Sequence, residues 1–164
     1  MSLLPLPKHP KEVLFVCTGN SCRSVMAEGL FRKMAQERSL DIAARSCGTS
    51  ALEGIGASIE TRRVMKDRGV DVGGHRGRKI SPDIIDRADI IFVMQTAHRD
   101  YVNALFPDAR DRVYLLSDFY PGEKREFTTG IPDPIGMGGE FYQNVLEVIQ
   151  KSLEGVFERL QSSK

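Results

Sequence analysis

The residues with the clearest chemical potential lie in one short segment, which runs from Cys17 to Ser24. An apolar run, residues 13–16, ends at Cys17, and the small polar residues that follow lead to Arg23 and then to a helical pattern. A strand, a short loop and a helix N-terminus in this order form an anion site, because loop N–H groups and the helix dipole point to the same place. This site would contain its own nucleophile, Cys17, and its own bidentate cation, Arg23.

The spacing between Cys17 and Arg23 suits a loop that binds a tetrahedral oxyanion, and we call residues 17–24 the cysteine loop. The intervening residues can curl around the anion with their backbone N–H groups pointing inward. We assign all of them to phosphate binding: Thr18, Gly19, Asn20, Ser21 and Cys22. Gly19 permits a sharp turn, and Asn20 tolerates the left-handed region while its amide can hold the shape of the loop.

A thiol attacks as its thiolate, and several features of the cysteine loop would stabilise that anion. They are the helix N-terminus, the Arg23 guanidinium and the loop N–H groups. Ser24 can cap the following helix and donate a hydrogen bond to the sulfur, so it joins the phosphate-binding set. The implied reaction is transfer of a phosphoryl group to sulfur, then hydrolysis, in which positioning and electrostatics dominate. The sequence has no Walker lysine and no carboxylate cluster, so we expect no metal, nucleotide or other cofactor.

The cysteine loop has no group that can protonate a leaving group, so an acid must come from elsewhere. The best candidate is Asp133, which lies late in a predicted long loop, residues 117–139, just before the last helix. The flanking residues Pro132 and Pro134 restrict the backbone and so fix the direction of the side chain. Because long loops in compact domains tend to be functional, we assign Asp133 as the catalytic acid.

Alternating strand and helix patterns predict the elements that position these residues. Short apolar runs predict buried strands at residues 12–17, 41–46, 89–94 and 112–116. Helical periodicity and start signals predict helices at residues 25–38, 58–68 and 96–105, a short helix that opens at Ser81, and a last helix over residues 141–160. This order predicts an α/β domain with a parallel sheet and helices on both faces. Ligands of such sheets bind at the carboxyl ends of the strands, where Cys17 lies.

Length and composition are consistent with one domain and limit its function. The chain has 164 residues and a net charge of +1, which argues against general nucleic-acid binding. No apolar run approaches the roughly 20 residues needed to span a bilayer. We divide the chain into a flexible N-terminal tail, residues 1–10, and a domain, residues 11–164. The cysteines are spaced unlike a disulfide framework or a zinc site, which predicts a reducing, cytoplasmic location.

Together these motifs resemble those of the low-molecular-weight protein tyrosine phosphatase family. The likeness rests on Val-Cys-Thr-Gly-Asn-Ser-Cys-Arg-Ser at residues 16–24 and on Asp-Pro at residues 133–134. Residues 46–50 and 75–78 resemble two further segments of the family, and the match covers nearly the whole chain from Lys11. The resemblance implies a single-domain, flavodoxin-like, three-layer sandwich of the phosphotyrosine phosphatase I type, in which helices flank a four-stranded parallel sheet.

The resemblance also implies a function, namely a metal-independent protein phosphatase that hydrolyses phosphotyrosine-type phosphomonoesters through a phosphocysteine intermediate. Cys17 would be the nucleophile, Arg23 the phosphate clamp, and Asp133 the acid and then the base. The partners would be phosphorylated proteins or peptides, with inorganic phosphate as product, and neither nucleic acid nor membrane. Cys22 matches the second loop cysteine of the family, which can form a reversible disulfide with the nucleophile; an ordinary packed side chain is the alternative.

Two places depart from the pattern of family members that act on phosphotyrosine. Ile135 and Gly136 stand where aromatic residues usually follow Asp-Pro, and Ser21 stands where a bulky aliphatic residue is common. This variation resembles the bacterial protein-arginine phosphatase branch, because a hydroxyl can hydrogen-bond a phosphoarginine guanidinium; Ser21 as a mere small loop residue is the alternative. An aromatic wall could still come from one of three residues: Tyr101, Phe119 or Tyr120.

Two other functions compete with this interpretation. An arsenate reductase needs two further cysteines to relay a disulfide, and none follows Cys47, which we expect to be a core residue. A binding module without turnover is disfavoured because nucleophile, clamp and acid are all present. His75 and His98 are not accompanied in the sequence by other residues of a metal site, and we expect both to have structural roles.

Overall fold

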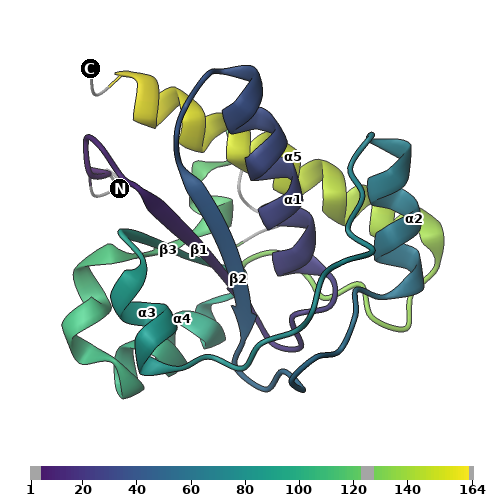
Figure 1. Cartoon of the computed structure of the whole chain (residues 1–164), viewed down its shortest axis with the longest axis horizontal. Coiled ribbons are helices and arrows are strands. Elements are labelled where there is room, and N and C mark those ends of the chain that lie inside the picture. Colours follow the sequence, from purple (N-terminus) through teal and green to yellow (C-terminus); the bar gives the residue numbers. More distant parts are fainter. Residues whose placement is uncertain (1–4, 123–127, 163–164) are drawn as a thin grey trace.

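One parallel sheet runs through the centre of the molecule in the computed structural model, which describes residues 5–122 and 128–162 (Figure 1). Its strands are β1 Glu12–Cys17, β2 Ala43–Gly48, β3 Ile90–Val93 and β4 Val113–Leu115. They lie in the order β2-β1-β3-β4, and every pairing is parallel. This is the strand order of flavodoxin-like sheets, so the predicted fold class is confirmed.

The helices begin and end close to the predicted positions. They are α1 Arg23–Glu37, α2 Ile59–Asp67, α3 Pro82–Arg87, α4 Thr96–Leu105 and α5 Gly139–Ser162, with 3₁₀ turns η1 Pro107–Arg112 and η2 Leu116–Phe119. Two predicted helix starts are confirmed. The Ser58 hydroxyl caps α2 by accepting from the Thr61 N–H, and the short helix that opens at Ser81 is capped by its hydroxyl, which accepts from the Ile84 N–H. The bounds of α4 are those predicted from the sequence.

Two segments differ from the prediction. The second strand lies two residues further along than predicted, because its register with β1 pairs Cys17 with Gly48 at the carboxyl edge. The long loop predicted at residues 117–139 starts instead with the turn η2. Residues 1–4 of the predicted tail, residues 123–127 of that loop and residues 163–164 of the predicted domain lie outside the described residues.

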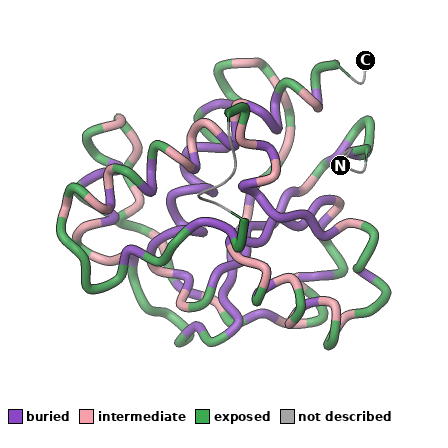
Figure 2. Tube along the Cα trace, turned by 180° about the vertical axis from the view of Figure 1, so that it is seen from behind, coloured by how far each residue is buried: buried purple, intermediate pink, exposed green. Residues whose placement is uncertain are grey.

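Helices cover both faces of the sheet, as predicted. Successive residues of β1 point to opposite faces, so Phe15 packs with α1 and α5 while Leu14 packs with α3 and α4. On the first face, the Phe31 ring lies 5.7 Å from Phe15 and 4.8 Å from Phe157, measured between ring centroids. Figure 2 shows the buried trace concentrated along the strands and along the inner sides of the helices.

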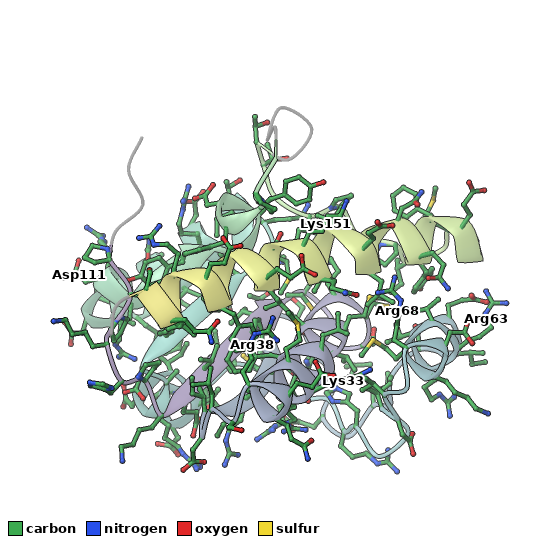
Figure 3. All side chains as sticks on the ribbon, turned by 90° about the horizontal axis from the view of Figure 1, so that it is seen from above. Lys33, Arg38, Arg63, Arg68, Asp111 and Lys151 are labelled. Carbon is green, nitrogen blue, oxygen red and sulfur yellow. The ribbon has the colours of Figure 1, made fainter. Side chains whose placement is uncertain are left out.

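The ends of the described chain pack onto this core. Leu6 is buried in the cluster under α1 and α5, and the Tyr114 hydroxyl donates to the Pro5 carbonyl over 3.1 Å. At the end of α1, the Arg38 guanidinium lies 4.7 Å from the centroid of the Phe157 ring of α5 (Figure 3). The predicted division of the chain at residue 10 stays a prediction. Within the described ranges, no helix combines the length and the apolarity that crossing a membrane requires.

Candidate active site

The cysteine loop leaves the sheet at its centre, because Cys17 is the last residue of β1. The Cys17 sulfur lies 2.9 Å from the Ser24 hydroxyl and accepts a hydrogen bond from the Asn20 N–H over 3.3 Å. Both contacts stabilise a thiolate. The prediction that Ser24 caps the helix is wrong: α1 begins at Arg23, and Ser24 lies inside the first turn with its hydroxyl directed at the sulfur.

Asn20 holds the shape of the cysteine loop. It adopts a left-handed conformation, with φ of 53°, and is fully buried. Its amide nitrogen donates to Ser24 Oγ over 2.8 Å and to Ser46 Oγ over 2.9 Å, while its Oδ1 accepts from the Arg78 N–H over 3.0 Å. The ring of His75 contacts the Asn20 carbonyl through Nε2 over 2.8 Å. Every polar group of the Asn20 side chain is therefore paired, as burial requires.

The end of β2 supports the cysteine loop from the neighbouring strand. The Thr49 N–H donates to the Cys17 carbonyl and the Ser50 N–H to the Thr18 carbonyl, each over 2.9 Å. At Gly48 an added Cβ would lie only 2.4 Å from the Thr18 carbonyl oxygen, so the approach requires glycine. The two loops are thus held together by backbone contacts.

Among the residues that the structure describes, Arg23 is the largest fully buried side chain, with 2 % of its surface exposed. One terminal nitrogen, Nη1, donates to Gln95 Oε1 over 2.7 Å and to the Ile131 carbonyl over 2.9 Å. The other, Nη2, lies 3.5 Å from Asp133 Oδ2. A buried guanidinium needs such partners, and those on Nη1 fix the plane of the group beside the Cys17 sulfur.

Gln95 and His98 form a second layer behind this guanidinium, and sequence reasoning missed Gln95. The backbone N–H of Gln95 donates to His98 Nδ1 over 3.0 Å, so the ring proton is on Nε2, which donates to Thr18 Oγ1 over 2.8 Å. Burial and then the positive charge of Arg23 lower the pKa of His98 to about 4. The one signal in the sequence was position: Gln95 follows the clearest predicted strand, at the edge where ligands bind.

Asp133 lies in the acid loop, residues 128–138, whose base is fixed to the end of β3. The Thr96 N–H donates to the Thr129 carbonyl over 3.0 Å, and the Ile131 N–H donates to the Met94 carbonyl over 2.8 Å. Gly130 has φ of 111°, and an added Cβ would lie 2.2 Å from the Met94 carbonyl oxygen. This bridge places Asp133 beside Arg23 although the two residues are far apart in sequence.

The Asp133 carboxylate is partly open to solvent, with 42 % of its side chain exposed. Its Oδ1 accepts from the Ile135 N–H over 3.1 Å, and its Oδ2 faces Arg23. Cys17, Arg23 and Asp133 line one small pocket, together with residues of both loops: Gly19, Ser21, Cys22 and Ile135. The carboxyl group can therefore exchange protons with a group bound in this pocket and with water.

Two of the three residues considered for an aromatic wall pack into the core of the molecule. The prediction that Phe119 could supply this wall is wrong, because Phe119 is buried in the core against Phe92. Tyr101 packs with the core cluster on the α3 and α4 side, away from the pocket. An aromatic residue that we did not predict, Tyr142 of α5, places its hydroxyl 3.6 Å from the Cys22 sulfur. Burial raises the pKa of Tyr142 to about 12.

The remaining cysteine and histidines have the structural positions expected of them. Cys47 is fully buried on the opposite face of the sheet from Cys17, and burial raises the pKa of its thiol. His75 and His98 both contact the cysteine loop and hold it in place. Among the side chains that the structure describes, no group of three or more His, Cys, Asp or Glu residues is arranged to hold a metal ion.

The pocket combines a thiol, a cation and a carboxyl group, and further residues of the cysteine loop border it. Such an arrangement can bind a tetrahedral anion, attack its central atom from sulfur and exchange a proton with the departing oxygen. Arg23 and the N-terminus of α1 would stabilise the negative charge of the transferring group.

Comparison with protein families matches residues 12–164 to the low molecular weight phosphotyrosine protein phosphatases. A protein-arginine-phosphatase from Geobacillus stearothermophilus is 31 % identical over 94 % of this chain and 99 % of its own length. A low molecular weight protein-tyrosine-phosphatase from Streptomyces coelicolor is 32 % identical over 88 % of this chain and 90 % of its own length. The sequence is thus similar to relatives of both substrate types.

Solved structures support the same relationship. The low molecular weight protein tyrosine phosphatase of T. tengcongensis superposes with a TM-score of 0.84 at 32 % identity, covering 92 % of this chain and 99 % of that one. The YwlE arginine phosphatase of Geobacillus stearothermophilus gives a TM-score of 0.82 at 32 % identity, covering 93 % and 94 % of the two chains. The likeness therefore spans nearly the full length of each protein.

Proposed function

Because this chain belongs to the low molecular weight phosphotyrosine protein phosphatase family, we propose that Cys17, Arg23 and Asp133 hydrolyse phosphorylated side chains of proteins. The observation that carries the proposal is the shared pocket, in which the sulfur, the guanidinium and the carboxylate meet from three separate elements. The family is one of cysteine-based phosphatases, which act on phosphoric monoesters.

In the first step the Cys17 thiolate attacks the phosphorus atom. A sulfur–phosphorus bond forms while the bond from phosphorus to the leaving oxygen breaks, and Asp133, as the carboxylic acid, gives its proton to that oxygen. Arg23 binds the transferring oxygens through N–H groups that Gln95 and Ile131 do not engage. The backbone N–H groups of residues 18–22 contribute further donors to the same oxygens.

In the second step water hydrolyses the phosphocysteine. The Asp133 carboxylate now accepts a proton from water, the water oxygen bonds to phosphorus, and the sulfur–phosphorus bond breaks to release inorganic phosphate and the thiolate. The Ser24 hydroxyl, 2.9 Å from the sulfur, stabilises the departing thiolate. Both steps need the same Asp133 side chain, first protonated and then ionised.

Trapping the intermediate tests this mechanism. Rapid acid quenching with a radiolabelled aryl phosphate should label the wild type on Cys17, and Cys17→Ser should lose turnover by at least about 10³-fold. Cys47→Ala is the matched control, because it removes a thiol from the other face of the sheet. Full turnover in Cys17→Ser, or a label on another residue, would exclude the mechanism.

A second candidate substrate is phosphoarginine. It is favoured by Ser21, which lines the pocket and whose hydroxyl could accept a hydrogen bond from a guanidinium, and by the relatives named protein-arginine-phosphatases. A bulky aliphatic side chain at Ser21 would remove this hydrogen bond and narrow the pocket. Ser21→Ile should therefore lower the ratio of phosphoarginine to phosphotyrosine peptide turnover, whereas Ser21→Thr should keep it. An unchanged ratio in Ser21→Ile would exclude Ser21 as a selector.

We also propose that Cys22 is a redox partner of Cys17. Both sulfurs line the same pocket and both are free thiols. One molecule of peroxide would accept two electrons and two protons from the pair, which leaves a disulfide and two waters. Because turnover needs Cys17 reduced, a reducing compartment such as the cytoplasm suits the enzyme.

A further inference from the structure

Large apolar side chains exposed to water are concentrated at one end of the molecule. Six such residues occur in the described part of the chain, and Leu105, at the end of α4, is the one that lies elsewhere. The other five lie in the loop after β2, at the start of α2 and in the acid loop, and we call them the apolar rim: Leu52, Ile55, Ile59, Ile135 and Met137. The most exposed are Ile59, at 74 %, and Leu52, at 68 %. Exposed apolar side chains that gather in one region of a surface are typical of interaction sites.

Backbone contacts tie the first side of the apolar rim to the cysteine loop. The Ser58 N–H donates to the Ser21 carbonyl over 3.0 Å, and Ile59 follows directly as the first residue of α2. The Ser50 N–H donates to the Thr18 carbonyl, two residues before Leu52. Ile59 therefore lies one residue, and Leu52 two residues, from a hydrogen bond to the cysteine loop.

The acid loop forms the second side of the apolar rim. Ile135 lines the pocket itself, and Met137 follows it in a turn in which the Met137 N–H donates to the Pro134 carbonyl over 2.9 Å. At the end of this loop, Gly139 lies against the Arg63 and Glu60 side chains of α2. Figure 1 shows the loops after β1 and β2, the start of α2 and the segment before α5 gathered at one end.

The pocket is too small to hold the backbone of a protein substrate. Its lining consists of seven residues close to the Cys17 sulfur, which suits one phosphorylated side chain but not the chain on either side of it. The flanking residues of a protein substrate must then lie across the mouth, where the apolar rim is continuous with the pocket through Ile135. The Arg63–Glu60 pair compensates part of the charge on α2, and the five exposed side chains of the apolar rim offer apolar contact to these residues.

We propose that the apolar rim binds aliphatic or aromatic side chains that flank the phosphorylated residue, and that the enzyme therefore selects phosphoprotein segments with apolar neighbours. The inference rests on the proposed function and specifies its substrate class. Covering the exposed part of Ile59 or Met137 with an apolar neighbour removes enough surface from water to raise kcat/KM by about 5- to 10-fold.

Paired peptides test the inference. Two peptides share one phosphorylated residue, flanked in the first by leucines and in the second by serines, and para-nitrophenyl phosphate serves as a substrate without flanks. The wild type should prefer the leucine peptide by at least about fivefold. The double variant Ile59→Ser/Met137→Ser should lose most of that preference, with a larger loss on the leucine peptide than on para-nitrophenyl phosphate. Leu105→Ser, a matched exposed residue outside the rim, should keep the preference.

Three outcomes would overturn the inference. They are equal turnover of the two peptides by the wild type, an equal loss on all substrates in the double variant, and the same change in Leu105→Ser. Sedimentation over a range of concentrations tests whether a second copy of this chain binds the apolar rim instead. If the wild type forms a dimer that the double variant does not form, and the two peptides turn over equally, the apolar rim is a self-association surface. Failure of the proposed function itself looks different, because para-nitrophenyl phosphate would then not be hydrolysed either.

Discussion

The guanidinium of Arg23 is held by Gln95 through a hydrogen bond of 2.7 Å, and Gln95 is held in turn by the ring of His98. A neutral acceptor in this position fixes the direction of the guanidinium without neutralising its charge. The positive charge is then shared between Asp133, at 3.5 Å, and any anion bound at the cysteine loop. Gln95 thus acts as a positioning residue for the phosphate clamp.

Gln95→Leu should weaken the binding of phosphate. The substitution leaves a buried N–H of Arg23 without its side-chain acceptor, and such a loss next to a charged group corresponds to about a 10-fold rise in the inhibition constant of inorganic phosphate. Gln150→Leu is the matched control, since Gln150 of α5 accepts a hydrogen bond of the same kind from Arg68, at the end of α2. An unchanged inhibition constant in Gln95→Leu would show that Arg23 does not depend on Gln95.

Asp133→Asn should lower the hydrolysis of esters with poor leaving groups more than that of esters with good leaving groups. An amide cannot protonate the departing oxygen, so kcat/KM for phenyl phosphate should fall by about 10²-fold or more, and for a dinitrophenyl phosphate by much less. The comparison within one variant controls for any change in folding. Equal losses on both esters would indicate that Asp133 binds substrate and does not act as the acid.

Gly130→Ala should displace the acid loop. At φ of 111° an alanine is strained, and its Cβ would lie 2.2 Å from the Met94 carbonyl oxygen. The free energy of unfolding should fall by more than about 2 kcal/mol. Activity should fall as well, because Ile131 and Asp133 follow within three residues. Gly54→Ala has a similar backbone, with φ of 80°, but meets no atom within 4 Å, so it should cost only about 1 kcal/mol. Urea unfolding measures both, and equal costs would contradict the steric argument.

His98 should make the fold sensitive to mild acid. Its pKa is about 4 in the folded chain and about 6.5 when unfolded. Between these values the unfolded chain takes up a proton that the folded chain does not, so the contribution of His98 to stability is constant above about pH 6.5 and falls as the pH drops toward 4. Urea unfolding at pH 7 and 4.5 should show a loss about 2 kcal/mol greater in the wild type than in His98→Gln. Equal losses would mean that His98 does not titrate in this range.

The local part of the site could be predicted from the sequence, because its geometry is set by a few adjacent residues. The spacing from Cys17 to Arg23 defines a loop between a strand and a helix, and Asn20 is compatible with the left-handed turn found there. Asp133 was assigned from its flanking prolines and its place in a motif. The fold followed from the alternation of apolar runs with helical periodicity.

The long-range part could not be predicted, since it depends on which segments the fold brings together. Gln95 lies 72 positions from Arg23, and Ile131 contributes only a backbone carbonyl, which no side-chain pattern reveals. Phe119 looked available for a substrate wall, but the sheet draws it into the core beside Phe92. The two-residue shift of β2 likewise follows from its register with β1.

The strand that carries Cys17 lies between β2 and β3, with helices over both faces. Its amide hydrogens should exchange with solvent only when the whole domain opens, whereas those at the base of the acid loop depend on a short bridge to Met94 and Gln95. We therefore expect gentle denaturation to open the acid loop first, which would leave a form that still binds phosphate at the cysteine loop but has lost the proton donor. In that form, hydrolysis of esters with poor leaving groups would disappear before the binding of phosphate.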